Sequence, residues 1–251
     1  MFLRSCLLAA CALSLNGASA PQFLNRTVTT GGVTYRYMVS TPPDWTAARS
    51  WPVVLFLHGS EERGDDGVQP SFVGLPLAVR RHPDRFPAII VIPQCRPGLD
   101  WKDPAMQTQI LAALDAAVSE FHGDPKRLYL TGFSMGGYGT WALAAKHPDR
   151  FAAIVVVCGG IQWPTPARIQ DDTPYAAIAD RVARLPIWVF HGSADRNVFV
   201  TESQEMVKLL RARNANVHYT EYPGVAHNSW DRAYAEPDLP AWLFAQRLPK
   251  Q

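Results

Sequence analysis

The stretch Leu128-Tyr-Leu-Thr-Gly-Phe-Ser-Met-Gly-Gly137 decides the fold class of this 251-residue chain. It begins as an apolar run of strand length and ends in the G-x-S-x-G pattern of Gly132, Ser134 and Gly136. The next segment, 138–146, predicts a helix that stops before Pro148. A serine on so sharp a strand-to-helix turn stands clear of the backbone, and the two glycines relieve the crowding around it. The pattern favours a nucleophilic Ser134, although by itself it leaves open an ordinary Gly/Ser turn in an α/β protein.

Apolar runs of strand length alternate with helical segments along the rest of the chain. Uninterrupted apolar runs are typical of strands covered on both faces, so this alternation predicts an α/β fold with a mostly parallel sheet and right-handed crossovers. A hairpin with a Gly31-Gly32 turn is expected to precede the sheet. The expected elements are hairpin 25–40, strands 53–57, 88–92, 128–131, 153–157, 186–190 and 217–222, and helices 107–121, 138–146, 201–213 and 239–247.

Residues 1–20 are expected to be a secretory signal peptide that is not part of the fold. One positive charge lies in 1–4, residues 6–15 are apolar, and Ala18-Ser-Ala20 is a small-x-small cleavage signal. This predicts an exported protein, periplasmic or extracellular, whose residues 21–251 form one domain. The alternative is a lipoprotein box that ends at Cys11 and anchors the chain there. No other segment is apolar for long enough to span a bilayer.

Charge and cysteine content narrow the classes of partner. The formal net charge of +2 gives no reason to expect nucleic acid or an anionic membrane as partner. No His/Cys/Asp group has the spacing of a metal site, and no G-x-G-x-x-G follows a strand, so neither a metal nor a cofactor is expected. After cleavage the chain would keep Cys95 and Cys158. Export would permit a disulfide between them, but the two expected strands are not neighbours, so the sequence leaves the pairing open.

A serine nucleophile needs a base to take its proton. His227 is the best candidate among the seven histidines, because it lies in a loop between the last expected strand and the terminal helix. His58 and His191 each precede a glycine at a strand end, where a structural role is expected. His227 is therefore predicted to be the base.

The base in turn needs an acid that orients it. Asp195 follows the buried strand 186–190 directly, where a carboxylate can reach a histidine ring. The alternatives Asp171, Asp172 and Asp180 lie in a polar stretch before that strand and are expected to be solvated. Asp195 is therefore the predicted acid.

The negative oxygen of a tetrahedral intermediate needs two N–H donors. The amide of Met135 is one candidate, because it follows the nucleophile. The other is expected in the loop after strand 53–57, from Ser60 or, as the next choice, from Glu61. A charged stretch follows, which is expected to be solvated; the alternative hypothesis is that a salt bridge of Glu62 or Arg63 holds this loop.

Taken together, these motifs resemble the α/β-hydrolase superfamily. Three further matches are similar to a bacterial group of secreted esterases often labelled predicted peptidases, related to feruloyl-esterase-like and polyhydroxyalkanoate-depolymerase-like enzymes. The resemblance covers nearly all of 21–251 and implies the α/β-hydrolase fold and hydrolysis of carboxylic esters without a cofactor. The superfamily motifs are His58-Gly59, Gly132–Gly136, His191–Asp195 and Gly224–His227, and the group matches are Leu57–Asp66, Pro93–Cys95 and His227–Tyr234.

The sequence also gives hints about the substrate. Between Gly160 and the strand at 186 there is room for a loop and one short helix, so no large cap domain is expected. An uncapped site would admit small or polymer-attached esters. Trp101, Trp163 and Trp230 follow strand ends or His227 and are candidates for substrate contacts, with loop packing as the alternative for each.

The prediction is therefore a serine carboxylesterase with Ser134, His227 and Asp195 as its triad, acting on short-chain, aryl or feruloyl-type esters. A serine peptidase or acyltransferase with the same triad is the alternative. A hydrolase-fold binding module without activity is a more remote one, because it predicts a broken triad. The sequence indicates no oligomeric state.

Overall fold

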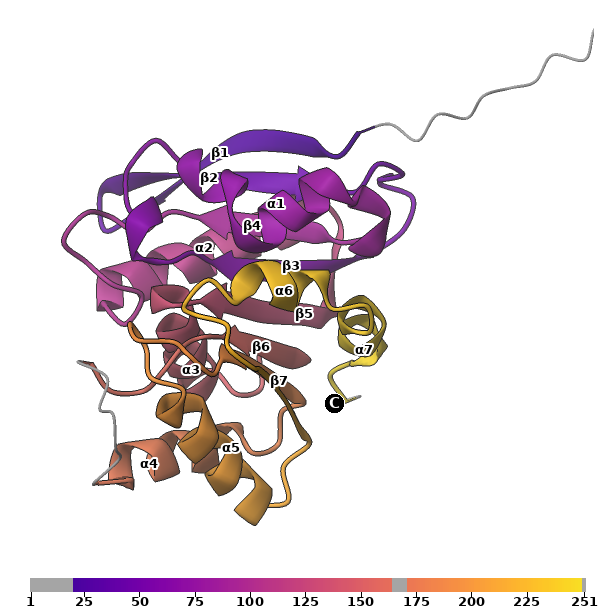
Figure 1. The fold of residues 1–251 in the computed structure, drawn as a ribbon. Coiled ribbons are helices and arrows are strands. Elements are labelled where there is room, and N and C mark those ends of the chain that lie inside the picture. The colour runs from indigo at the N-terminus through magenta and orange to yellow at the C-terminus, as the bar shows by residue number, and fades with distance from the viewer. Residues whose placement is uncertain (1–19, 164–170, 250–251) are drawn as a thin grey trace, which may run out of the picture.

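A computed structural model describes residues 20–163 and 171–249. Eight strands form one sheet in the order β1-β2-β4-β3-β5-β6-β7-β8 (Figure 1). The β1–β2 and β2–β4 pairs are antiparallel and all other pairs are parallel, which confirms the predicted sheet. The strands are β1 Gln22–Thr30, β2 Val33–Thr41, β3 Trp51–Leu57, β4 Ile89–Pro93, β5 Gly123–Phe133, β6 Ala153–Val157, β7 Ile187–Gly192 and β8 Val217–Tyr222.

Helices cover both faces of the sheet, and each face has its own apolar cluster. Alternate residues of β3 show the division: Val53 and Leu55 belong to one cluster, whereas Val54 and Phe56 belong to the other. The first cluster lies under α2 Pro104–Glu120, α3 Met135–Lys146, α4 Thr173–Val182 and α5 Thr201–Ala212, and the second under α1 Gly74–Arg81, α6 Trp230–Ala235 and α7 Leu239–Ala245.

The sequence predicted a helix before the His82–Phe86 motif, where α1 lies, without bounds, and did not predict α6. The interval between β6 and β7 contains the short helix α4, in agreement with the expectation of a loop and one short helix there. The proposed signal peptide lies outside the described residues except for Ala20. Cys95 and Cys158 are buried free thiols, so the disulfide that the sequence left open is not formed.

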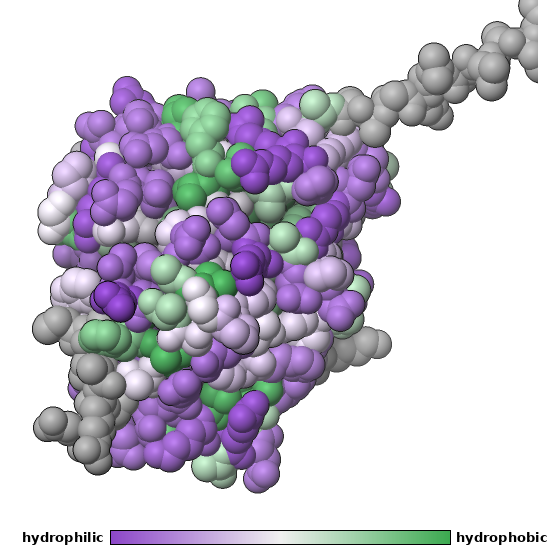
Figure 2. Space-filling model, viewed as in Figure 1, coloured by the Kyte–Doolittle hydropathy of each residue, from purple (hydrophilic) through white to green (hydrophobic). Residues whose placement is uncertain are grey.

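The parallel strands end at one edge of the sheet, and their carboxyl ends carry the predicted functional residues. Ser134 follows β5, Ser60 follows β3, and Asp195 follows β7. On the face seen in Figure 2, apolar side chains form separate small groups among polar ones. In the described ranges, no helix is long and apolar enough to cross a membrane.

Candidate active site

Ser134 occupies a strained turn between β5 and α3. Its φ of 52° and ψ of −123° lie in a region that residues with a side chain rarely adopt. A Cβ at Gly136 would lie 1.9 Å from the Leu57 carbonyl oxygen, and a Cβ at Gly132 would lie 2.4 Å from the Gly136 oxygen. Both predicted elbow positions therefore require glycine, because the turn packs directly against the end of β3.

The structure brings Ser134, His227 and Asp195 together. His227 Nε2 lies 2.8 Å from Ser134 Oγ, and His227 Nδ1 lies 2.7 Å from Asp195 Oδ2. A carboxylate accepts hydrogen bonds, so Nδ1 carries the proton and Nε2 is free to accept one from the serine. The three side chains form one continuous hydrogen-bonded series.

The alternative acids take other roles. Asp180 pairs with Arg213 at 2.6 Å, and Asp171 accepts a hydrogen bond from the Thr173 amide. Asp172 is the N-cap residue of α4. In the described structure, none of these three aspartates is hydrogen-bonded or ion-paired to His227.

Asp195 is buried but held in its charged form. Burial opposes the charge, yet His191, His227 and the Val198 amide together keep the pKa of Asp195 well below its usual range. Its second oxygen, Oδ1, accepts hydrogen bonds from the amides of Asn197 and Val198, at 2.9 and 3.0 Å. The carboxylate therefore keeps its charge and has a fixed orientation.

A pocket of about 460 Å³ opens in front of Ser134. Trp101 and Trp163 are among its lining residues; Trp163 is 68% exposed, whereas the Trp101 side chain is fully buried. Their contact with substrate stays a prediction. Trp230 is not among the lining residues; its ring packs on Phe133 at 4.5 Å and against His227 at 5.6 Å. Trp230 therefore does not line this pocket, because α6 packs its half-buried ring against the second apolar cluster; a substrate contact at Trp230 stays a prediction. The complete lining is Ser60, Arg63, Asp100, Trp101, Lys102, Ser134, Met135, Tyr138, Trp163 and Val198.

The proposed oxyanion residues border this pocket. Ser60 begins the short 3-10 helix Ser60–Glu62, and Met135 is the first residue of α3. Both residues line the pocket beside Ser134. The role of the two amides stays a prediction.

The loop after β3 is not held by the hypothesised salt bridge. Arg63 donates to the Leu99 carbonyl at 2.6 Å, and within the described ranges its guanidinium has no carboxylate partner. Glu62 lies 3.9 Å from His58 Nδ1, but burial lowers the pKa of His58 to about 4 and leaves this ring uncharged at neutral pH. Hydrogen bonds from side chains to main-chain carbonyls hold the loop instead. One of them runs from Gln94 Nε2 to the Glu62 carbonyl oxygen at 3.0 Å.

Comparison with known proteins assigns the chain to a family. The model of the dienelactone hydrolase family matches residues 92–236, more than half of the chain. The chain belongs to the dienelactone hydrolase family. The matched range includes Ser134, Asp195 and His227, and it leaves out the loop that carries Ser60.

Similar proteins agree with membership in the dienelactone hydrolase family. A solved structure titled as a thermostable esterase has 30% identity and a TM-score of 0.78, with 90% of this chain and 63% of that chain covered. A protein of Escherichia coli K12 named "Putative carboxymethylenebutenolidase" is 32% identical over 142 residues, which are 54% of this chain and 49% of its own. The chain spans about half the length of this curated relative.

A structure of a feruloyl esterase module from Clostridium thermocellum supports the fold alone. It has 16% identity and a TM-score of 0.72, with 92% of this chain and 90% of that chain covered. The sequence-based resemblance to α/β hydrolases, with feruloyl esterases among the structural neighbours, is thereby confirmed.

A cluster of three side chains could offer ligands to a metal ion. Among the described residues, Cys158, Asp195 and His227 place their ligand atoms within 4.8 Å of one another. Burial raises the pKa of the Cys158 thiol to about 12, and Asp195 is already bonded to His227. Two of the three groups are therefore hydrogen-bonded to each other and the third is a neutral thiol. This arrangement fits a proton-transfer site better than a metal site.

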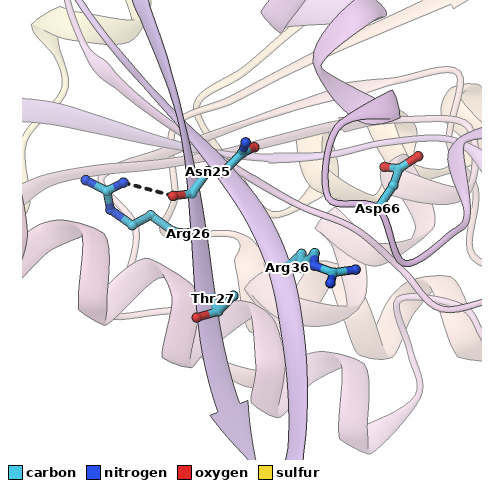
Figure 3. Close-up of a pocket in the computed structure, with 5 residues that line it drawn as sticks. All are labelled: Asn25, Arg26, Thr27, Arg36 and Asp66. Atoms are coloured by element: carbon cyan, nitrogen blue, oxygen red, sulfur yellow. Dashed lines mark hydrogen bonds between the residues drawn. The ribbon is translucent and has the colours of Figure 1, made fainter.

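A second hollow of this dienelactone hydrolase family member lies on the outer hairpin. Asn25, Arg26, Thr27, Arg36 and Asp66 line it (Figure 3). Arg26 is engaged by the Glu120 carboxylate and donates to the Asn25 carbonyl. Asp66 caps the amides of Val68 and Gln69. Arg26 and Asp66 are thus hydrogen-bonded within the protein itself, so the pocket beside Ser134 is the better candidate for a functional site.

Proposed function

We propose that this chain is a carboxylic ester hydrolase that acts through Ser134, His227 and Asp195. The observation that carries the proposal is the continuous series of hydrogen bonds, 2.8 Å from Ser134 Oγ to His227 Nε2 and 2.7 Å from His227 Nδ1 to Asp195 Oδ2. This is the arrangement that activates a serine hydroxyl. Membership in the dienelactone hydrolase family and the similarity to an esterase structure support hydrolysis of an ester.

The geometry supports a two-step reaction. Ser134 Oγ attacks the ester carbonyl carbon while His227 Nε2 takes the hydroxyl proton. The amides of Met135 and Ser60 donate to the negatively charged oxygen of the tetrahedral intermediate. The carbon–oxygen bond to the alcohol then breaks, and His227 gives its proton to the departing alcohol.

Water completes the reaction. It attacks the acyl group on Ser134 and loses a proton to His227, and the carboxylic acid leaves as His227 returns that proton to Ser134 Oγ. Throughout, the negative Asp195 carboxylate stabilises the imidazolium form of His227.

The pocket supports a class of substrate. The exposed ring of Trp163 and the Tyr138 ring beside it give the pocket an aromatic wall, which suits a short acyl chain or an aryl group. The pocket is open toward solvent beside the exposed Trp163. We therefore propose short-chain or aryl esters, either free or attached to a polymer.

Initial rates on a panel of substrates test this function. The panel contains p-nitrophenyl acetate, butyrate and laurate, methyl ferulate, and a peptide p-nitroanilide as the amide. The wild type is expected to cleave the short or aryl esters, and Ser134→Ala to lose at least about 10³-fold in kcat, since removal of a triad serine costs this much or more.

The matched control is Ser119→Ala, which removes an exposed serine hydroxyl from α2 and should leave the rates unchanged. Circular dichroism melting establishes that each variant is folded. Equal ester hydrolysis by wild type and Ser134→Ala, or no ester hydrolysis by folded wild type, would contradict the proposal. Faster cleavage of the amide than of every ester would favour a peptidase.

A further inference from the structure

We propose that His191 is a positioning residue that fixes the Asp195 carboxylate through Oδ2, the same oxygen that faces His227. The inference rests on the proposed function, because Asp195 matters only if His227 is the base. His191 is fully buried at the end of β7. The reaction described above makes no use of it, and the sequence suggests only a structural role.

The hydrogen bonds of His191 define which ring nitrogen carries a proton. Nε2 lies 2.9 Å from the Val198 carbonyl oxygen and 3.3 Å from Asp195 Oδ2. Both of these oxygens can only accept a hydrogen bond, so Nε2 carries hydrogen whether the ring is neutral or charged. Nδ1 lies 2.7 Å from Ser203 Oγ on α5, a contact separate from the two that Nε2 makes.

Asp195 is thereby surrounded by donors. Oδ1 accepts the two amides of Asn197 and Val198. Oδ2 faces His227 Nδ1 at 2.7 Å and His191 Nε2 at 3.3 Å. An oxygen that faced His227 alone could follow the ring as it moves. With His191 also facing it, the carboxylate has one favoured orientation.

Another ionisable group that faces this carboxylate is the buried thiol of Cys158, which directly follows β6. Burial raises its pKa to about 12, so it is neutral at working pH. Of the two imidazoles on Oδ2, His227 exchanges a proton in each turnover, whereas the Nε2 hydrogen of His191 stays between the Val198 carbonyl oxygen and Asp195. His191 is thus the fixed partner of the pair.

Three variants test the role of His191. His191→Met has a similar volume but no donor, and His191→Gln offers an amide donor near the former position of Nε2. Ser203→Ala removes the partner of Nδ1, on the side of the ring that faces away from Asp195. The readouts are kcat and KM on the p-nitrophenyl ester that the wild type cleaves fastest, at a temperature at which melting curves find every variant folded.

His191→Met is expected to lose on the order of 10- to 100-fold in kcat, the range in which outer partners of functional groups act, with KM changed less than about 3-fold. His191→Gln should recover most of the loss. Ser203→Ala should keep kcat within about 3-fold of the wild type, even if its melting temperature falls as far as that of His191→Met. Equal kcat losses in Ser203→Ala and His191→Met, or no recovery in His191→Gln, would overturn the proposal.

The pH profile of kcat/KM gives an independent readout. Without His191, the Asp195 charge acts on His227 alone and favours its protonated form more strongly. The acid limb, which reports His227, is therefore expected to move to higher pH in His191→Met and to stay in place in Ser203→Ala. An acid limb that stays or moves down in His191→Met would contradict the proposal.

Ser134→Ala in the same assay separates this inference from the proposed function. Activity that persists in Ser134→Ala overturns the proposed function and, with it, the role of His191. An inactive Ser134→Ala together with an unimpaired His191→Met overturns the role of His191 alone.

Discussion

His58 is a fully buried histidine whose protonation the fold opposes. Its Nε2 accepts a hydrogen bond from the Cys95 amide at 3.0 Å, so the proton of the neutral ring is on Nδ1, 2.6 Å from the Gly59 carbonyl. The Trp101 ring packs edge-on at 4.9 Å. Burial lowers the pKa of His58 to about 4. The ring thus supports the proposed oxyanion loop only in its neutral form.

This depressed pKa predicts how stability depends on pH. The unfolded chain binds a proton at His58 near pH 6.5, but the folded chain does so only near pH 4. The contribution of the neutral His58 ring to the free energy of unfolding is therefore fully present above about pH 6.5, and it is lost as the pH falls from about 6.5 to about 4. Between pH 7 and pH 4 the loss amounts to ~3 kcal/mol of the free energy of unfolding.

His58→Gln isolates this contribution, because the glutamine oxygen can accept the Cys95 amide but does not titrate. Urea unfolding of both proteins at several pH values from 7 to 4 is the measurement. The carboxylates titrate alike in the wild type and in His58→Gln, so their effect on stability cancels when the two curves are compared. We expect the two stability curves to converge by ~3 kcal/mol as the pH falls; curves that stay parallel would refute the prediction.

The site residues that sequence reasoning found are those marked by local patterns. Ser134 lies in a glycine-flanked turn, and Asp195 and His227 follow strands in loops of recognisable composition. The pocket residues Tyr138 and Val198 were missed. Tyr138 is one of many apolar positions in a buried helix, and nothing local distinguishes it. Only the three-dimensional packing of α3 brings its ring to the pocket.

At the scale of elements, the turn between β5 and α3 is locked to the neighbouring strand β3. A side chain at Gly136 would meet the Leu57 carbonyl at 1.9 Å, and a main-chain carbonyl in a central strand cannot move aside. Gly136→Ala is therefore expected to destabilise the protein by about 3 kcal/mol or more, at the upper end of the cost of overpacking. Thermal unfolding of the purified variant measures this.

Gly31→Asn is the matched control for that variant. Gly31 has a φ of 55° in the hairpin turn and no atom within 4 Å of an added Cβ. Asparagine tolerates this conformation, so a shift of less than about 1 kcal/mol is expected. A Gly136→Ala variant as stable as Gly31→Asn would show that the elbow has room for a side chain.

Repeated local signals explain why most element boundaries could be predicted. The motif His-Pro-Asp-Arg-Phe occurs at 82–86 and 147–151, each time after a helix and before a buried strand. In both copies the histidine is the C-cap residue and the phenylalanine is buried. The helix α6 lacks such a signal; it has six residues, and so short a helix depends on tertiary packing rather than on its own sequence.

At the scale of the whole molecule, strand order is the feature that the sequence could not specify. Apolar runs predict strands buried on both faces, but they do not say that β3 lies between β4 and β5. Nor do they predict that the C-terminal segment returns to the second face of the sheet, where the Tyr129 hydroxyl donates to the Gln246 carbonyl at 2.8 Å. These contacts join residues far apart in the chain, and local patterns carry no information about them.

The localisation of the whole molecule is predicted from residues 1–20. Their apolar part, 6–15, is shorter than the roughly 20 residues needed to span a bilayer as a helix, and small residues follow it. We therefore expect that the full chain, expressed in a Gram-negative bacterium, is recovered from the periplasm with a mass that begins after Ala20. Intact-mass spectrometry of the fractionated protein measures this, and Ala18→Arg, which disrupts the small-x-small signal, should leave the precursor uncleaved.

Cys11→Ser distinguishes the lipoprotein alternative. A signal peptide cut after Ala20 does not depend on this thiol, so processing should be unchanged. A lipoprotein would instead carry a diacylglycerol mass on Cys11 in the membrane fraction, and Cys11→Ser would stop its maturation.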